Sequence, residues 1–188
     1  MTVLSDATIE KLIHEETIKI DPYNSEQLQP ASYDFLLHPT ILVFENHTQP
    51  VIDPYNKPED LHRAVVATEE KPFVLHPGEF ILGSTVEVIT LPDHVIARCE
   101  GKSSLGRIGL LIHATAGFVD PGFSGQITLE LANVSRQPIL LHPNMRIGQF
   151  SFEYLDSPAR KPYGHPDLNS KYQNQQGPVG SRYHGNRR

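Results

Sequence analysis

The chain has 188 residues, of which 38% are hydrophobic, and a formal net charge of −6. This length and composition predict one folded domain over residues 1–188 and exclude a largely disordered chain. The acidic balance gives no general attraction to nucleic acid polymers, so a partner that carries phosphates would need a local cationic pocket.

The cysteine content and the N-terminus indicate a cytoplasmic protein without membrane attachment. Cys99 is the single cysteine, so no intrachain disulfide can form, and a reducing cytoplasm is the expected compartment. The opening sequence MTVLSDATIEKLIHEE lacks the basic and then apolar pattern of a secretory signal. The apolar runs are too short for a transmembrane helix, so we expect no membrane partner.

The N-terminal part of the chain predicts one amphipathic helix and then irregular structure. Ser5 can serve as the N-cap, and apolar residues follow at helical spacing, which predicts a helix from residue 5 to about residue 15. The stretch 16–70 shows no regular pattern. It contains two short apolar runs, at 35–37 and 41–44. The turn-forming sequence DPYN occurs twice in it, at 21–24 and 53–56.

Strand patterns dominate the chain after Pro72. FVLHPGEFILGSTVEVITLP at 73–92 predicts two strands around a His-Pro-Gly turn, followed by a third strand. ILLHPNMRIGQFSFEYL at 139–155 repeats the pattern, which predicts two related hairpins in one β-structure. Further strands are expected in HVIARCE, GLLIHAT and GQITLELANV, at 94–100, 109–115 and 125–134. The expected fold class is therefore mainly β.

One of these strands carries a candidate catalytic carboxylate. Polar and apolar residues alternate from Gln126 to Leu131, so Gln126, Thr128 and Glu130 are expected on one face. An isolated strand glutamate is more often solvated or ion-paired than catalytic. The pattern alone leaves both interpretations open.

GKSSLGR at 101–107 is a candidate phosphate loop. It combines small flexible residues and two hydroxyls with the cations Lys102 and Arg107, which suits a polyphosphate. The GxxxxGK[ST] spacing of a Walker A loop is absent. The alternative is a capped surface turn, in which Ser103 caps a short helical turn and Arg107 lies one turn further on.

Other reactive residue types have structural interpretations. Asp120 lies in a turn-forming Asp-Pro-Gly sequence, and His113 on an apolar strand is expected to be a hydrogen-bonded core histidine. His76 and His142 occupy matching turn positions. Cys99 has no obvious base beside it and is expected to be a buried, inert thiol.

The sequence excludes a zinc mechanism. Zinc nucleoside deaminases need H-x-E together with P-C-x-x-C or comparable ligands, and one cysteine cannot supply them. No HExxH sequence occurs either.

The tail from about residue 156 differs in composition from the strands before it. It is polar, rich in glycine and proline, and has too few apolar residues to bury a core of its own. We therefore expect it to be disordered, or to be ordered by a ligand or by a neighbouring subunit.

Several long motifs resemble the dCTP deaminase family, which belongs to the larger dUTPase group. GKSSLGRIGLLIHATAGFVDPGFSGQITLEL and SKYQNQQGPVGSR carry most of this resemblance. LQPASYDFLL, FVLHPGEFILGST and RIGQFSF extend it over most of the chain. The resemblance implies a distorted jelly roll of the dUTPase-like β-clip type, with a short N-terminal helix and a flexible C-terminal lid over residues 156–188.

The resemblance also implies a substrate and an assembly. It implies a homotrimer with active sites shared between subunits, a dCTP or dUTP substrate that carries Mg²⁺ on its triphosphate, possible inhibition by dTTP, and no zinc. By position, Glu130 resembles the catalytic glutamate, and Ser103 and Arg107 resemble its helpers. The residues that resemble substrate contacts are Lys102, Ser103, Ser104, Leu105, Gly106, Arg107, Asp120, Thr128, Leu129, Glu130, Gln149, Tyr163, Lys171 and Gln175.

One short segment separates two branches of the family. Deaminases that release dUTP resemble TAHR where this chain has Thr115-Ala116-Gly117-Phe118. Gly117 and Phe118 therefore imply a bifunctional enzyme that also cleaves dUTP to dUMP and pyrophosphate. The alternatives are a deaminase that stops at dUTP, a plain dUTPase, a module that senses dNTPs without turnover, and a jelly roll without a ligand.

Overall fold

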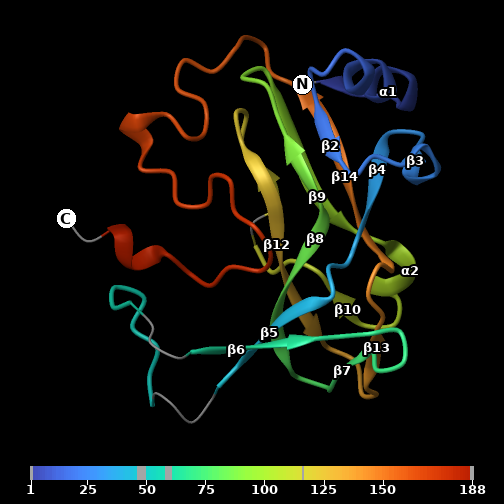
Figure 1. Cartoon of the computed structure of the whole chain (residues 1–188), viewed down its shortest axis with the longest axis vertical. Helices are drawn as coiled ribbons and strands as arrows, with labels where there is room; N and C mark the ends of the chain where they lie inside the picture. The colour runs from blue at the N-terminus through green and yellow to red at the C-terminus, as the bar shows by residue number, and fades with distance from the viewer. Residues whose placement is uncertain (1, 46–49, 58–60, 116, 187–188) are drawn as a thin grey trace.

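The computed structural model describes residues 2–45, 50–57, 61–115 and 117–186, and most of its regular structure is β-strand (Figure 1). Within these residues the strands form two six-stranded sheets and one two-stranded ribbon. The first sheet has the spatial order β11-β9-β14-β4-β3, with β1 paired to β14. Its strands are β1 (Thr2–Val3), β3 (Leu28–Gln29), β4 (Ser32–Leu36), β9 (Val95–Gly101), β11 (Phe118–Val119) and β14 (Arg146–Tyr154).

The second sheet contains the longest strands of the described chain. Its spatial order is β10-β12-β8-β5-β6, with β2 paired to β8. Its strands are β2 (Lys19–Asp21), β5 (Thr40–Phe44), β6 (His62–Val66), β8 (Phe80–Thr90), β10 (Leu110–Leu111) and β12 (Ser124–Asn133). The mainly β prediction is confirmed, and the segment 16–70, expected to be irregular, contributes five of these strands, β2 to β6.

The two sheets enclose one apolar core. Phe35 on β4 and Phe150 on β14 are fully buried, and their ring centroids are 4.4 Å apart. Gly148 is required beside them, since a Cβ at this position would lie 2.3 Å from the Phe35 ring. Leu129 and Leu131 of β12 pack into the same core. Alternation along the strands therefore directs large side chains inward from both sheets.

The short helices lie at the margins of the sheets. Helix α1 (Asp6–His14) confirms the predicted N-terminal helix, with Ser5 as its N-cap. The Ser5 side chain makes no capping hydrogen bond to the helix backbone. None of the helices in the described ranges has the length and apolar composition needed to span a bilayer. The remaining helical turns are α2 (Ser103–Gly106), η1 (Ser25–Gln27), η2 (Pro166–Leu168) and η3 (Tyr183–Asn186).

The two His-Pro turns do not form hairpins, contrary to the sequence prediction. β7 (Phe73–Leu75) precedes the first turn and β13 (Ile139–Leu141) precedes the second, and these two strands pair with each other. The strands that follow the turns, β8 and β14, lie in different sheets. Each His-Pro turn is therefore a corner, at which the chain passes from the two-stranded ribbon of β7 and β13 into one of the six-stranded sheets. The expected second and third strands of 73–92 are also one continuous strand, β8.

A buried carboxylate connects the two sheets. Glu87 on β8 is fully buried, and its oxygens accept hydrogen bonds from the Gln27 amide at 2.8 Å and from the Leu36 backbone N–H at 3.0 Å. Leu36 lies on β4 in the other sheet. Burial raises the pKa of Glu87 above its usual range, because the charged form is poorly solvated. Glu87 therefore links the two sheets, and its raised pKa makes the stability of the fold depend on pH.

The stability of the protein relative to a Glu87→Gln variant should increase as the pH falls from about 8 to about 5. Because the pKa of Glu87 is higher in the folded chain than in the unfolded chain, its contribution is fully present below the unfolded pKa. The contribution is lost as the pH rises through the folded pKa. Urea unfolding of both proteins at matched concentration, over a pH series, measures this difference. A difference that is constant with pH, or that increases with pH, would contradict the assignment.

Candidate active site

The Glu130 carboxylate is fixed by the segment that follows β10. Its Oε2 accepts a hydrogen bond of 2.7 Å from the backbone N–H of Ala114, and its own N–H donates to the Ile112 carbonyl at 3.0 Å. The residue is half-buried. One carboxylate oxygen is therefore occupied by the protein, and Oε1 makes no hydrogen bond to any described residue.

The alternation predicted along β12 is confirmed from Thr128 to Leu131. Leu129 and Leu131 are fully buried in the core, whereas Thr128 and Glu130 are half-buried. A bulge interrupts the pairing of β12 with β8 between Gln126 and Thr128. Gln126 is consequently more buried than the alternation alone predicts, and its amide donates to the Val86 carbonyl at 2.9 Å.

The candidate phosphate loop, residues 102–107, contains a single helical turn. Lys102 is the N-cap of α2, because its carbonyl accepts hydrogen bonds from the N–H groups of Leu105 and Gly106, both at 3.0 Å. The expectation that Ser103 caps this turn is therefore wrong by one position. Ser103, Ser104, Gly106 and Arg107 are exposed, and Leu105 packs against the core.

The Lys102 side chain is bound to the protein itself. Its Nζ donates a 2.7 Å hydrogen bond to Oδ1 of Asp34, whose side chain is 2% exposed. Gln149, on the neighbouring strand β14, lies directly opposite Asp34 in the register, and its Oε1 accepts from the Ser32 hydroxyl at 3.1 Å. Two predicted phosphate contacts thus belong to one polar cluster on the first sheet.

A single chain does not bring all predicted catalytic residues together. Among the described residues, no hydrogen bond or ion pair joins Glu130 to Ser103 or Arg107. The loop follows β9 of the first sheet, whereas Glu130 lies on β12 of the second sheet. In Figure 1, α2 lies at the right edge of the molecule, whereas β12 runs through its middle.

Gly117 lies in a narrow space between two elements. Its carbonyl accepts a 2.7 Å hydrogen bond from the Cys99 N–H. A Cβ at this position would lie 2.9 Å from the Cys99 carbonyl oxygen and 3.3 Å from the His113 ring. The next residue, Phe118, is 49% exposed and lies 5.5 Å beneath the Arg98 guanidinium. Ala116, in the same motif, lies outside the described residues.

The reactive groups near this segment differ in their surroundings. Cys99 is buried, as expected, and burial raises the pKa of its thiol to about 12, which disfavours the reactive thiolate. The His113 Nδ1 is buried without a hydrogen-bond partner among the described residues, which contradicts the expected hydrogen-bonded histidine. Asp120 is exposed as a whole, yet partial desolvation raises the pKa of its carboxyl above the usual range.

The C-terminal tail lies along the upper part of β12 (Figure 1). The Gln126 N–H donates to the Gln175 carbonyl at 3.1 Å, and the Val179 N–H donates to the Thr128 hydroxyl at 3.1 Å. The Gln126 side chain accepts a hydrogen bond from the Gly177 N–H. The tail is thus ordered against the strand of its own chain, an arrangement that its composition does not predict.

The predicted tail contacts take different parts in this arrangement. Tyr163 donates its N–H to the Pro121 carbonyl at 2.8 Å, and its hydroxyl accepts from the Tyr172 N–H at 3.0 Å. The buried Gln175 donates its amide to the Gln126 carbonyl, and its Oε1 has no partner in the described chain. Lys171 is half-buried, and its carbonyl accepts from the Arg182 side chain.

Sequence reasoning missed Asp34 and the contact between Gln126 and the tail. Asp34 is a charged residue inside the otherwise uncharged strand sequence SYDFL, and this is a signal for a paired buried charge. No pattern in the sequence indicates that Gln126 meets the tail, because the two are separated by about fifty positions and meet only in the folded chain.

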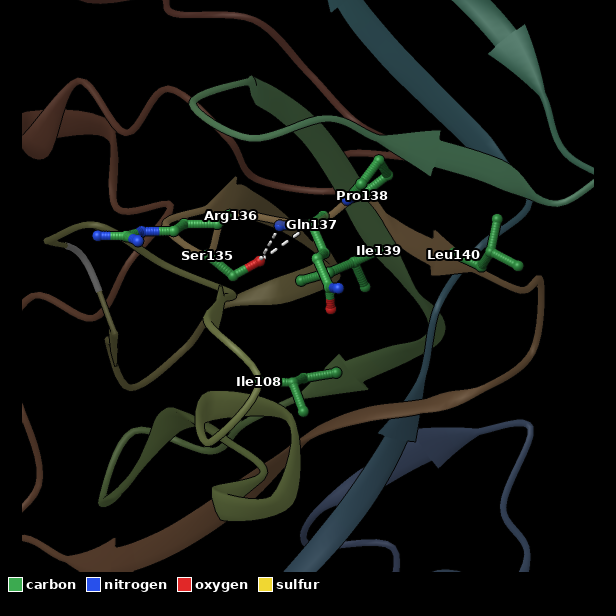
Figure 2. A pocket seen from close by; sticks show the side chains of 7 residues that line it. All are labelled: Ile108, Ser135, Arg136, Gln137, Pro138, Ile139 and Leu140. Atoms are coloured by element: carbon green, nitrogen blue, oxygen red, sulfur yellow. Dashed lines mark hydrogen bonds between the residues drawn. The ribbon is translucent and has the colours of Figure 1, made fainter.

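A separate hollow lies next to the candidate phosphate loop (Figure 2). It has a volume of about 570 Å³, and none of the predicted site residues lines it. The Ser135 hydroxyl oxygen lies 2.7 Å from Oδ1 of Asn133 and 2.9 Å from the Gln137 carbonyl oxygen, so its proton is used within the turn. The residues that line this hollow are Ile108, Ser135, Arg136, Gln137, Pro138, Ile139 and Leu140.

The fold is shared with enzymes that act on deoxynucleoside triphosphates. The structure of a 2′-deoxycytidine 5′-triphosphate deaminase from Agrobacterium tumefaciens matches with a TM-score of 0.64 and 22% identity. The match covers 81% of this chain and 48% of that one, so this chain spans about half its length. A mutant dUTPase from phage phi11 of S. aureus matches with a TM-score of 0.50 and 13% identity, over 77% of this chain and 95% of that one. These likenesses define a β protein with the dUTPase-like fold.

Sequence comparison defines the family more narrowly. Residues 3–155 match the family model described as dCTP deaminase-like. A dUMP-forming dCTP deaminase of Nocardioides sp. is 55% identical over 184 residues, which cover 98% of this chain and 96% of the relative. A protein of the same description from Clavibacter michiganensis is 53% identical, over 98% and 92%. The chain belongs to the dCTP deaminase-like family.

A Gln126→Ala variant should release the tail more readily. Loss of the side-chain contact to Gly177 removes one hydrogen bond, so trypsin should cleave after Lys171 and Arg182 roughly three to ten times faster. Timed proteolysis followed by mass spectrometry measures this rate. Gln137→Ala, which changes the same residue type away from the tail, serves as the control. Equal cleavage rates in the two variants would contradict the role of Gln126.

Proposed function

We propose that this protein converts dCTP to dUMP, ammonia and pyrophosphate, by deamination followed by cleavage of dUTP. The observation that carries this proposal is the half-buried Glu130 carboxylate, anchored on one oxygen, in a chain 55% identical to a dUMP-forming dCTP deaminase over nearly its full length. Substrate dCTP would enter with Mg²⁺ on its triphosphate. Among the described residues, no three His, Cys, Asp or Glu side chains form a metal-ligand set.

Glu130 would act as the base of the deamination. Because the Ala114 N–H occupies Oε2, Oε1 is the oxygen available to accept a proton from water. The resulting hydroxide adds to C4 of cytosine, and the carboxyl transfers the proton to N3. The carboxylate then takes the proton of the new C4 hydroxyl and delivers it to N4, so that the C4–N4 bond breaks and ammonia leaves as the C4 carbonyl forms. One water is consumed and dUTP is formed. In the second step, another water attacks the α-phosphate and pyrophosphate leaves.

Ser103 and Arg107 would assist this carboxylate from a neighbouring subunit. Among the described residues neither side chain has a hydrogen bond or ion pair to Glu130, and we propose a homotrimer whose active sites are completed between subunits. In this assembly Ser103 would position the attacking water, and Arg107 would stabilise developing negative charge. Asp120 and Thr128–Glu130 would contact the sugar and base. Lys102–Arg107 and Gln149 would form the phosphate side of the site.

The tail, about residues 156–188, would act as a lid over the bound nucleotide. Its contacts with Gln126 and Thr128 support this role, because these residues lie four and two positions before Glu130 on the same strand. Tyr163, Lys171 and Gln175 would then approach the phosphates and base. We further propose that dTTP inhibits at this site and that the enzyme acts in the cytoplasm.

Incubation with dCTP and Mg²⁺, followed by separation of dCTP, dUTP and dUMP, tests the function directly. Ammonia and pyrophosphate should appear in near-equal amounts, with little free dUTP. Stoichiometric accumulation of dUTP would show a deaminase that stops at the first step. Pyrophosphate release from dUTP without any ammonia release from dCTP would show a plain dUTPase.

Glu130→Gln should preserve the fold and dCTP binding but reduce ammonia release by about 10²–10⁴-fold, because the amide cannot act as a base. The amide oxygen can still accept the Ala114 hydrogen bond. Ammonia release measures the reaction, and calorimetric titration with dCTP measures binding. Near-normal ammonia release from this variant would exclude Glu130 as the base.

Replacing Gly117-Phe118 by His-Arg should reduce pyrophosphate release more than ammonia release. A side chain at position 117 would meet the Cys99 carbonyl, and an arginine at 118 would face Arg98 in place of the aromatic ring. Both changes should displace the segment beside the phosphate end of the site. The ratio of pyrophosphate to ammonia, measured also for Gly117→Ala, tests this expectation. An unchanged ratio in both variants would exclude the segment as the determinant.

A further inference from the structure

Asp34 is an anion buried between two cations. Its Oδ1 accepts from Lys102 Nζ at 2.7 Å, and its Oδ2 lies 3.7 Å from Nη1 of Arg146. The Asp34 side chain is 2% exposed, whereas those of Lys102 and Arg146 are 25% and 46% exposed. A carboxylate with so little access to water depends on these partners for its charge.

Asp34 is itself fixed by the surrounding strands. The backbone carbonyl of Asp34 accepts a 2.8 Å hydrogen bond from the Gln27 side-chain amide. In the sheet, Asp34 lies opposite Gln149 of β14. Arg146 is tied in turn, because its guanidinium donates to the Glu26 carbonyl at 3.1 Å. The carboxylate therefore has a defined position relative to the first sheet.

Lys102 transmits this position to α2. The residue that binds Asp34 through its ammonium is also the N-cap, whose carbonyl accepts from Leu105 and Gly106. The polar side chains that follow, Ser103 and Ser104, are exposed and make no hydrogen bond to another described residue. The ion pair is thus the polar side-chain connection from the start of this loop to the sheet.

We propose that Asp34 is a positioning residue for the phosphate-binding loop. It holds Lys102 at the start of α2, and this fixes the placement of residues 103–107 toward the triphosphate. Lys102 contributes to the phosphate side of the site through its ion pair with Asp34. The inference rests on the proposed function only in that residues 103–107 meet the triphosphate of the substrate.

Positioning can be separated from stability, because the two partners differ in exposure. Asp34→Asn removes the buried charge and leaves two cations that can reach water, so the melting temperature should change little. Lys102→Met leaves the buried carboxylate with only the more distant Arg146, so the melting temperature should fall further. Asp34→Asn is therefore the informative single variant.

The test compares Asp34→Asn, Lys102→Met, Lys102→Arg and the double variant Asp34→Asn/Lys102→Met. The KM for dCTP should rise at least about tenfold in Asp34→Asn and in Lys102→Met, with a smaller change in kcat. The double variant should be no worse than Lys102→Met, and Lys102→Arg, which keeps a cation beside Asp34, should raise the KM less than Lys102→Met does. Glu153→Gln is the matched control, since Glu153 is also a mostly buried carboxylate paired with a cation, Arg98, at 2.8 Å. Its KM should be unchanged.

A binding measurement makes the result independent of turnover. In a Glu130→Gln background, titration with Mg²⁺ and either dCTP or dCMP should show that Asp34→Asn weakens dCTP binding much more than dCMP binding. An equal loss for both ligands would indicate a merely structural role and overturn the proposal. A raised KM in Lys102→Met with a normal KM in Asp34→Asn would also overturn it, because the lysine would then bind phosphate directly. If the unmodified protein released no ammonia from dCTP, the proposed function would fail, whereas this titration would still test the position of the loop.

Discussion

Strand β12 has different hydrogen-bonding partners along its two edges, and the arrangement of the candidate site depends on this pairing. One edge pairs with β8 over most of the strand. The other edge meets β10 and Ile112 near its end and the C-terminal tail near its start. Glu130 lies where the partner changes. The carboxylate is therefore anchored by the chain before it, and the strand next to it remains available to the tail.

The two sheets separate the proposed catalytic carboxylate from the candidate phosphate loop. The loop begins where β9 leaves the first sheet, and the Glu130 carboxylate belongs to the second. Leu110 and Leu111 pair with β12, whereas Phe118 and Val119, a few positions later, pair with β9. A side chain at position 117 would meet both the Cys99 backbone of β9 and the ring of His113, the residue before Ala114. A substitution there can therefore disturb both the strand before the loop and the segment that holds Glu130.

Two buried carboxylates illustrate different solutions to the same electrostatic constraint. Glu87 receives hydrogen bonds from neutral donors, and burial raises its pKa. Asp34 receives an ammonium and lies near a guanidinium. The neutral donors of Glu87 connect the two sheets, whereas Lys102, the donor to Asp34, belongs to the loop before α2. A buried charge that recruits a loop residue constrains the loop as well as the core.

Local patterns predicted most of the strands after Pro72, the N-terminal helix and the alternation that isolates Glu130, because strand periodicity and capping depend on neighbouring residues. The long motifs also determined the family. Tertiary structure decided that the two His-Pro turns are corners, since the strands on either side of each turn pair with distant segments. It also decided that Lys102 binds Asp34 and that the tail lies on β12. These contacts join residues 51 to 68 positions apart, and such contacts leave no periodic signal in the sequence.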